Sequence, residues 1–134
     1  MGYKLRYKLG VGTTEQITYN PSPETIDFVI DELLPGLDHY IVLSSDELVR
    51  NCDCIQTVIS DKDDKPIIEF YVEVHFKADD SIIYYCKYIG EINEVKRLFR
   101  MFALEVIPDM NGWDDVTEKV EKIMEKQKAR GNKA

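Results

Sequence analysis

The chain has 134 residues, of which 44% are hydrophobic and 31% are charged, a composition typical of one soluble globular domain. It has no apolar run near the roughly 18 residues of a membrane-spanning helix, so no membrane partner is expected. The N-terminus lacks the apolar centre of a secretion signal, and three cysteines do not suit a disulfide framework, so we expect a reducing cytoplasm.

The net charge of −8 is concentrated in the middle of the chain. Residues 20–80 hold four basic and fifteen acidic side chains, a net charge of −11, whereas residues 1–19 carry +2 and residues 81–134 carry +1. Such an acidic surface repels phosphate backbones, so nucleic-acid binding is not expected. It would attract and steer a basic partner protein. Acidic surfaces also serve simply to keep proteins soluble.

The first part of the chain predicts a hairpin and then a helix. Residues 3–9 alternate apolar and basic side chains with a period of two, which indicates a strand, and residues 15–19 predict a second strand paired with it. Ser22 can cap a helix that has Pro23 in its first turn and reaches Leu34. Apolar residues at spacings of three and four form its buried stripe, namely Ile26, Val29, Ile30, Leu33, Leu34 and Leu37.

Residues 39–88 predict a four-stranded antiparallel meander. Its strands are expected at 39–44, 54–59, 67–76 and 81–88, with residues 45–51 as a polar connection or helical turn. The last two strands are rich in β-branched and aromatic residues. Even-numbered residues 68–76 are expected to form the core against which the helices pack.

A second amphipathic helix is predicted over residues 91–106, and a third follows the break at 108–112. The second helix is expected to bury Ile92, Val95, Leu98, Phe99, Phe102 and Val106. Asp114 and Asp115 can cap the third helix, which would bury Val116, Val120, Ile123 and Met124. We therefore predict one α+β domain over residues 1–128 and a frayed polar tail over 129–134. The domain would have a curved antiparallel sheet of five or six strands, two main helices on one face and a C-terminal helix.

One face of the strand at 67–76 carries the most suggestive side chains, Glu69, Tyr71, Glu73 and His75. Two carboxylates and an imidazole can do acid–base chemistry. The same pattern is typical of the solvent-facing side of a half-exposed sheet, and no nucleophile or cofactor motif accompanies it. We therefore predict no catalytic residue and no cofactor. This face is expected to bind a protein partner, together with Tyr85 and the hairpin tip of Asp61, Asp63 and Asp64.

The three cysteines leave a second question open. Cys52, Cys54, Cys86 and His75 are four residues of the two types, cysteine and histidine, that most often bind zinc. However, a period of two places Cys52 and Cys54 on the same strand face, and cysteine is often a small buried hydrophobic residue. We expect no metal site, and the sequence does not decide whether the thiols are reactive or merely buried.

The order of several short motifs resembles a group of proteins. Asn20-Pro21-Ser22 opens a helix, Ile55-Gln56-Thr57 lies in a strand, and Gly112-Trp113-Asp114-Asp115 precedes the last helix. This arrangement resembles small bacterial proteins that include immunity proteins of polymorphic toxin systems. The resemblance implies stoichiometric binding of a basic toxin by an acidic face, without catalysis. The alternatives are an assembly homodimer and a small enzyme that uses Glu69, Glu73 and His75.

Overall fold

The computed structural model describes residues 2–9, 14–33, 39–59, 70–78 and 81–131, and its class is α+β, as predicted. In chain order the elements are β1 (Tyr3–Lys8), β2 (Gln16–Tyr19), α1 (Pro23–Asp31), β3 (Tyr40–Val49), β4 (Cys52–Ile59), β5 (Phe70–Ala78), β6 (Ser81–Ile89), α2 (Ile92–Ala103), β7 (Asp114–Asp115) and α3 (Thr117–Gly131).

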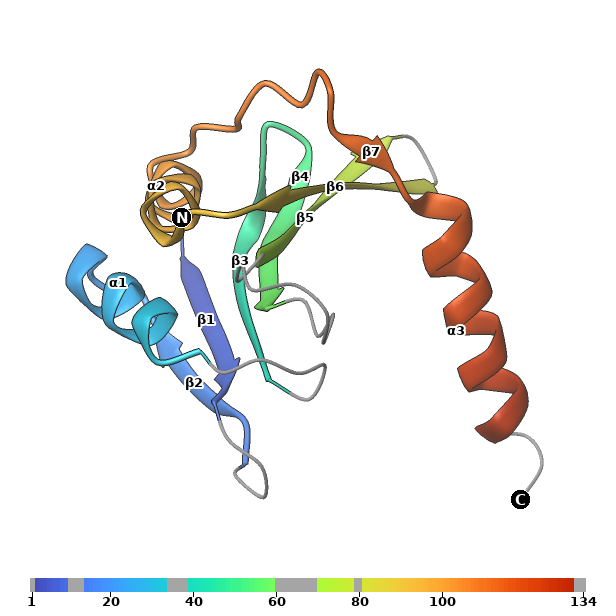
Figure 1. The fold of residues 1–134 in the computed structure, drawn as a ribbon, viewed down its shortest axis with the longest axis horizontal. Helices are drawn as coiled ribbons and strands as arrows, with labels where there is room; N and C mark the ends of the chain where they lie inside the picture. Colours follow the sequence, from blue (N-terminus) through green and yellow to red (C-terminus); the bar gives the residue numbers. More distant parts are fainter. Residues whose placement is uncertain (1, 10–13, 34–38, 60–69, 79–80, 132–134) are drawn as a thin grey trace.

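The strands form a sheet in the order β2-β1-β3-β4-β5-β6-β7, and each pairing between neighbours is antiparallel (Figure 1). The predicted hairpin of β1 and β2 and the meander from β3 to β6 are both present. Within the described residues the sheet has seven strands, where the sequence predicted five or six. The additional strand, β7, has two residues, Asp114 and Asp115, which the sequence predicted only as a helix cap.

The polar connection predicted at residues 45–51 is wrong. β3 continues to Val49, and a tight turn at Arg50 and Asn51 leads directly into β4. Both turn residues have positive φ, 46° and 69°, as in the hairpin turns that match the twist of two antiparallel strands. An irregularity of the β3–β4 register between Ser44 and Val49 interrupts the period of two, so this part of the strand has no clear alternation.

The predicted cap of α1 is present, because the Ser22 Oγ accepts a hydrogen bond of 3.1 Å from the Thr25 backbone N–H. The helix ends at Asp31, earlier than the predicted Leu34, and residues 34–38, including Leu37, lie outside the described residues. Asp31 and Asp27 of α1 form ion pairs with Lys96 and Arg100 of α2, at 2.7 and 3.6 Å. Part of the acidity of the middle segment is therefore offset within the fold.

One core joins α1 and α2 to the sheet. Its buried members are Leu5, Ile26, Val29, Ile30, Leu33, Ile41, Leu43, Val49, Cys52, Ile55, Ile59, Ile89, Val95, Leu98, Phe99 and Phe102. The register sets Phe70, Val74 and Phe76 of β5 opposite the core residues Ile59, Ile55 and Cys52. That placement agrees with the prediction that even-numbered positions of β5 belong to the core face.

The predicted burial of Val106 is wrong, because α2 ends at Ala103. Glu105, with φ of 63°, turns the chain out of the helix, and the Val106 side chain is 42% exposed.

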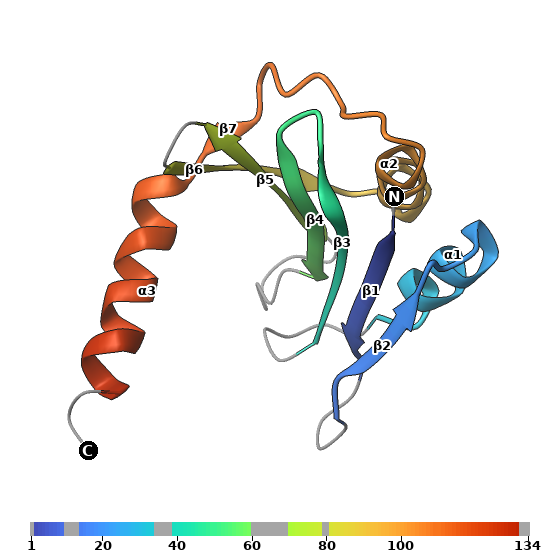
Figure 2. The ribbon, with the colours of Figure 1, turned by 180° about the vertical axis from the view of Figure 1, so that it is seen from behind.

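The third helix, α3, lies at the opposite end of the molecule from α1 and α2 (Figures 1 and 2). Its first turn is attached to β6, where Thr117 Oγ1 accepts a hydrogen bond from the Tyr84 N–H and the Val116 N–H donates to the Tyr84 carbonyl. Ile123 and Met124, predicted to be buried, are 49% and 53% exposed because this part of α3 extends beyond the sheet. The helix continues to Gly131, into the segment for which the sequence predicts a frayed tail. Within the described residues, the helices are too short or too polar to span a membrane.

Candidate binding face

The predicted site residues do not all lie on one face of the sheet. Tyr71, Glu73 and His75 occupy alternate positions of β5, and His75 is opposite Tyr84 of β6. Tyr85 is the next residue along β6 and is opposite Val74, so it lies on the other face. Tyr85 therefore lies away from the face that carries His75. Glu69 and the acidic tip of Asp61, Asp63 and Asp64 lie outside the described residues.

The register instead assembles a set of residues from five strands on the sheet face opposite the core. The pairs are Lys4 with Ser44, Ser44 with Cys54, Cys54 with His75, and His75 with Tyr84. We call these five residues the cross-strand row. The sequence neighbours Leu5, Leu43 and Ile55 point into the core, so alternation places the row on the opposite side.

Within the cross-strand row, the ionisable side chains of Cys54 and His75 are in direct contact. The Cys54 Sγ lies 3.3 Å from the His75 Nδ1. The Tyr84 ring packs edge-on against the imidazole, with the ring centroids 4.5 Å apart and the planes at 79°. Cys54 is 6% exposed and Tyr84 is 8% exposed, whereas His75 is half-buried. The imidazole therefore lies between a thiol and an aromatic ring.

Cys52 does not share this environment, and the prediction that Cys52 and Cys54 lie on one strand face is wrong. Cys52 pairs with Phe76 and Cys54 with His75, so β4 advances two residues where β5 advances one. A bulge of this kind reverses the facing of the residues before it. Cys52 consequently lies in the core, where burial raises the pKa of its thiol to about 11.

The described residues contain no group of three or more histidine, cysteine, aspartate or glutamate side chains that could hold a metal ion. The bulge accounts for this in part, because it separates Cys52 from Cys54 and His75. The four candidate zinc ligands named from the sequence are therefore not brought together.

Charge is distributed unevenly over the candidate face. Lys4, Arg6 and Lys8 alternate along β1 with the core-facing residues, and Arg6 lies 3.7 Å from Glu15. Next to β1, Glu47 and Asp53 of the β3–β4 hairpin are exposed, and Asp53 lines one hollow together with Lys4 and Arg6. Basic and acidic side chains thus lie close together at this part of the sheet.

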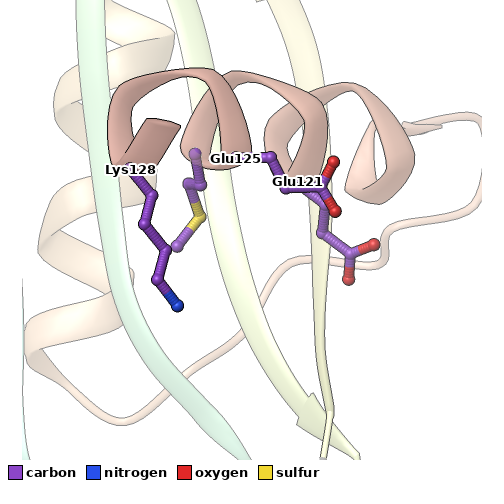
Figure 3. Close-up of a pocket in the computed structure, with 4 residues that line it drawn as sticks. Glu121, Glu125 and Lys128 are labelled. Atoms are coloured by element: carbon purple, nitrogen blue, oxygen red, sulfur yellow. The ribbon is translucent and has the colours of Figure 1, made fainter. Parts of the chain in front are cut away.

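The exposed part of α3 adds a shallow hollow lined by Glu121, Met124, Glu125 and Lys128. Glu121, Glu125 and Lys128 project from one side of the helix (Figure 3). Met124 also approaches the cross-strand row, since its Sδ lies 4.0 Å from the Tyr84 hydroxyl. The hollow thus combines acidic side chains with exposed apolar surface.

The sequence grouped His75 and Cys54 only as two of four candidate zinc ligands, and it did not place Lys4, Ser44 or Tyr84 beside them. The row depends on the register across four strand pairs, and that register is set by a hairpin turn and a bulge without a sequence signature. Only the alternation within each strand could have assigned these residues to the solvent side.

The chain matches no family model, no curated protein and no solved structure among known proteins. The resemblance to immunity proteins therefore stays a prediction.

Proposed function

We propose that the chain is a non-catalytic binding protein whose partner is a basic protein, such as a toxin that it neutralises. The docking surface is the β4–β6 side of the sheet face that carries His75, together with the exposed part of α3. The observation that carries the proposal is the exposed apolar surface of Ile123 and Met124 on α3, beside Glu121 and Glu125. Adjoining exposed apolar side chains with a polar rim are a feature of protein–protein interaction sites.

The arrangement of the helices supports the choice of face. In this proposal α1 and α2 cover one face of a curved sheet, and the partner occupies the other. The core cluster contains residues of α1, α2 and the sheet, whereas α3 makes its main contacts with β6 alone. The face opposite the core is thus left with half-buried polar side chains such as Ser44, Gln56 and His75.

The charge distribution supports a basic partner. Asp27 and Asp31 of α1 are engaged by bases of α2, so this part of the negative charge of the middle segment is offset within the fold. Glu47 and Asp53 are exposed, and Glu73 occupies β5 between Gln56 and Cys86. Long-range attraction of this kind raises the rate of association and weakens with added salt.

The test expresses the protein encoded immediately upstream of this chain, for which the proposal predicts toxicity. We expect co-expression of this chain to restore growth, and the purified pair to bind with an affinity that falls as salt is raised. Glu73→Lys should weaken binding at least about tenfold, a loss of roughly 1.4 kcal/mol in binding free energy. The matched control is Glu32→Lys, because Glu32 is an exposed acid at the end of α1, away from the proposed face. Absence of binding to that protein, or equal loss in both variants, would contradict the proposal.

A homodimer is the second candidate, and one observation favours it. Within the described residues β2 is an edge strand paired only with β1, and its Ile17 and Tyr19 side chains are 46% and 71% exposed. An open edge of this kind can pair with the same edge of a second copy.

A further inference from the structure

We propose that Cys54 is a reactive thiol, activated by His75, that is oxidised by hydroperoxides and alkylated by small electrophiles. This inference concerns a modification site and stands whether or not the sheet face binds a protein partner.

The geometry satisfies the first requirement of an activated cysteine, which is a base within hydrogen-bond distance. The Cys54 Sγ and the His75 Nδ1 are 3.3 Å apart, on directly opposite positions of β4 and β5. A neighbouring imidazole can accept the thiol proton, and the resulting imidazolium stabilises the thiolate, which is the nucleophilic form. The Tyr84 ring, edge-on to the imidazole, holds its orientation.

Other residues of the sheet and of α3 lie near the pair. Tyr84 and Cys86 of β6 lie on the same sheet face, and the register places Glu73 two residues from His75 along β5. Lys4 of β1 lies in the same row, beyond Ser44 of β3. From α3, the Met124 Sδ lies 4.0 Å from the Tyr84 hydroxyl. The contact with His75 is the one that brings a base to the Cys54 thiol.

Cys52 gives an internal reference for an inert thiol. It lies in the core and is fully buried. Its Sγ is 3.9 Å from the Arg50 carbonyl oxygen, which cannot take up the proton of the thiol. Burial without a base keeps a thiol protonated, so two cysteines that are two residues apart should differ strongly in reactivity.

The proposed step balances with a hydroperoxide as the oxidant. The Cys54 proton passes to His75 Nδ1, and the thiolate sulfur attacks the outer peroxide oxygen. The O–O bond breaks, and the departing alkoxide or hydroxide takes the proton from the imidazolium. The sulfur is oxidised to a sulfenic acid, and the peroxide is reduced to an alcohol or water.

The sheet geometry prevents either of the other cysteines from resolving this sulfenic acid. Cys54 and Cys86 lie on β4 and β6 with β5 between them, so their backbones are separated by about two strand spacings, roughly 10 Å. A disulfide needs Cα atoms within about 7 Å. Cys52 points into the core on the other face. An external small thiol must therefore reduce Cys54, through a mixed disulfide and with release of water.

The test is quantitative alkylation of the folded chain with iodoacetamide, followed by peptide mass analysis of all three cysteines. At pH 7 we expect Cys54 to react at least about tenfold faster than Cys52, the ratio expected when an imidazole increases the thiolate fraction. His75→Gln should lower the alkylation rate of Cys54 about tenfold. The increase of that rate with pH should also occur at a higher pH than in the unchanged protein. Hydrogen peroxide should produce a sulfenic acid at Cys54 that a dimedone probe captures and a small thiol removes.

Two controls separate this role from a structural one. His39→Gln replaces the other histidine of the chain, which lies before β3, so it should preserve both the rate and the pH profile of Cys54. In denaturant the three cysteines should react at similar rates, which excludes a local sequence effect. Equal rates for Cys54 and Cys52 in the folded protein, or an unchanged pH profile in folded His75→Gln, would overturn the proposal.

Discussion

Two phenylalanines show how strongly the effect of one side chain depends on its place. Phe99 of α2 is fully buried, whereas Phe28 of α1 is 65% exposed. We expect Phe99→Ala to lower the free energy of unfolding by about 3–5 kcal/mol, because it removes a large apolar group and leaves a cavity. Phe28→Ala removes the same atoms from a largely hydrated site, so it should change the free energy of unfolding by less than about 0.5 kcal/mol. Urea denaturation of the two variants measures both values, and similar losses would place Phe28 in the core.

The cysteines show where prediction from the alternation of residues along one strand fails. The period of two predicted over residues 3–9 places Leu5 on the apolar face of its strand, and Leu5 is buried in the core. A period of two fails at Cys52 because the bulge of β4 adds one residue. Bulges depend on the tertiary pairing of two strands, so a single-strand pattern does not contain them.

At the scale of elements, Asp115 is expected to hold the start of α3. Its Oδ1 accepts hydrogen bonds from the Thr117 hydroxyl at 2.6 Å and the Thr117 N–H at 3.0 Å. These bonds, the hydroxyl's foremost, lower the pKa of the Asp115 carboxyl below its ordinary 3.8. The stabilisation is therefore complete above the ordinary pKa, and it is lost as the pH falls through the lowered value.

Replacement of this carboxylate should loosen the helix. We expect Asp115→Ala to speed hydrogen–deuterium exchange of the α3 amides at pH 7. The control is Asp114→Ala, because Asp114 occupies the neighbouring position of β7 and does not cap the helix. If both variants exchange alike, α3 is held by its contact with β6 rather than by the cap.

The elements also differ in how far their bounds follow from the sequence. The start of α1 is predictable, because Asn20-Pro21-Ser22-Pro23 contains a cap and a first-turn proline. The end of α2 is not, because the apolar spacing continues to Val106 while the backbone leaves the helix at Glu105. The turn at Arg50 and Asn51 lacks the glycine that usually marks a two-residue hairpin turn. The strand predicted at residues 39–44 therefore ends too early, and the strand predicted at 54–59 begins too late.

For the whole molecule, a linear charge count overstates the acidic surface. Asp27 and Asp31 belong to the segment with a net charge of −11, yet they pair with bases of α2 from a later part of the chain. Three basic residues of β1 lie on the same sheet face as Ser44, Cys54 and His75. The candidate face is therefore mixed in charge.

The two edges of the sheet bear on whether the chain assembles with itself. The edge strands are the shortest of the described sheet, four residues in β2 and two in β7. Short edge strands limit edge-to-edge pairing, so the exposed Ile17 and Tyr19 alone are not expected to hold a stable dimer. We expect size-exclusion chromatography with light scattering to give the mass of one chain at every concentration. Twice that mass, reduced to one chain by Ile17→Lys and unaffected by Phe28→Lys, would instead assign the chain to the assembly class. If the chain is a monomer, α3 and the adjoining sheet face stay available to bind a different protein.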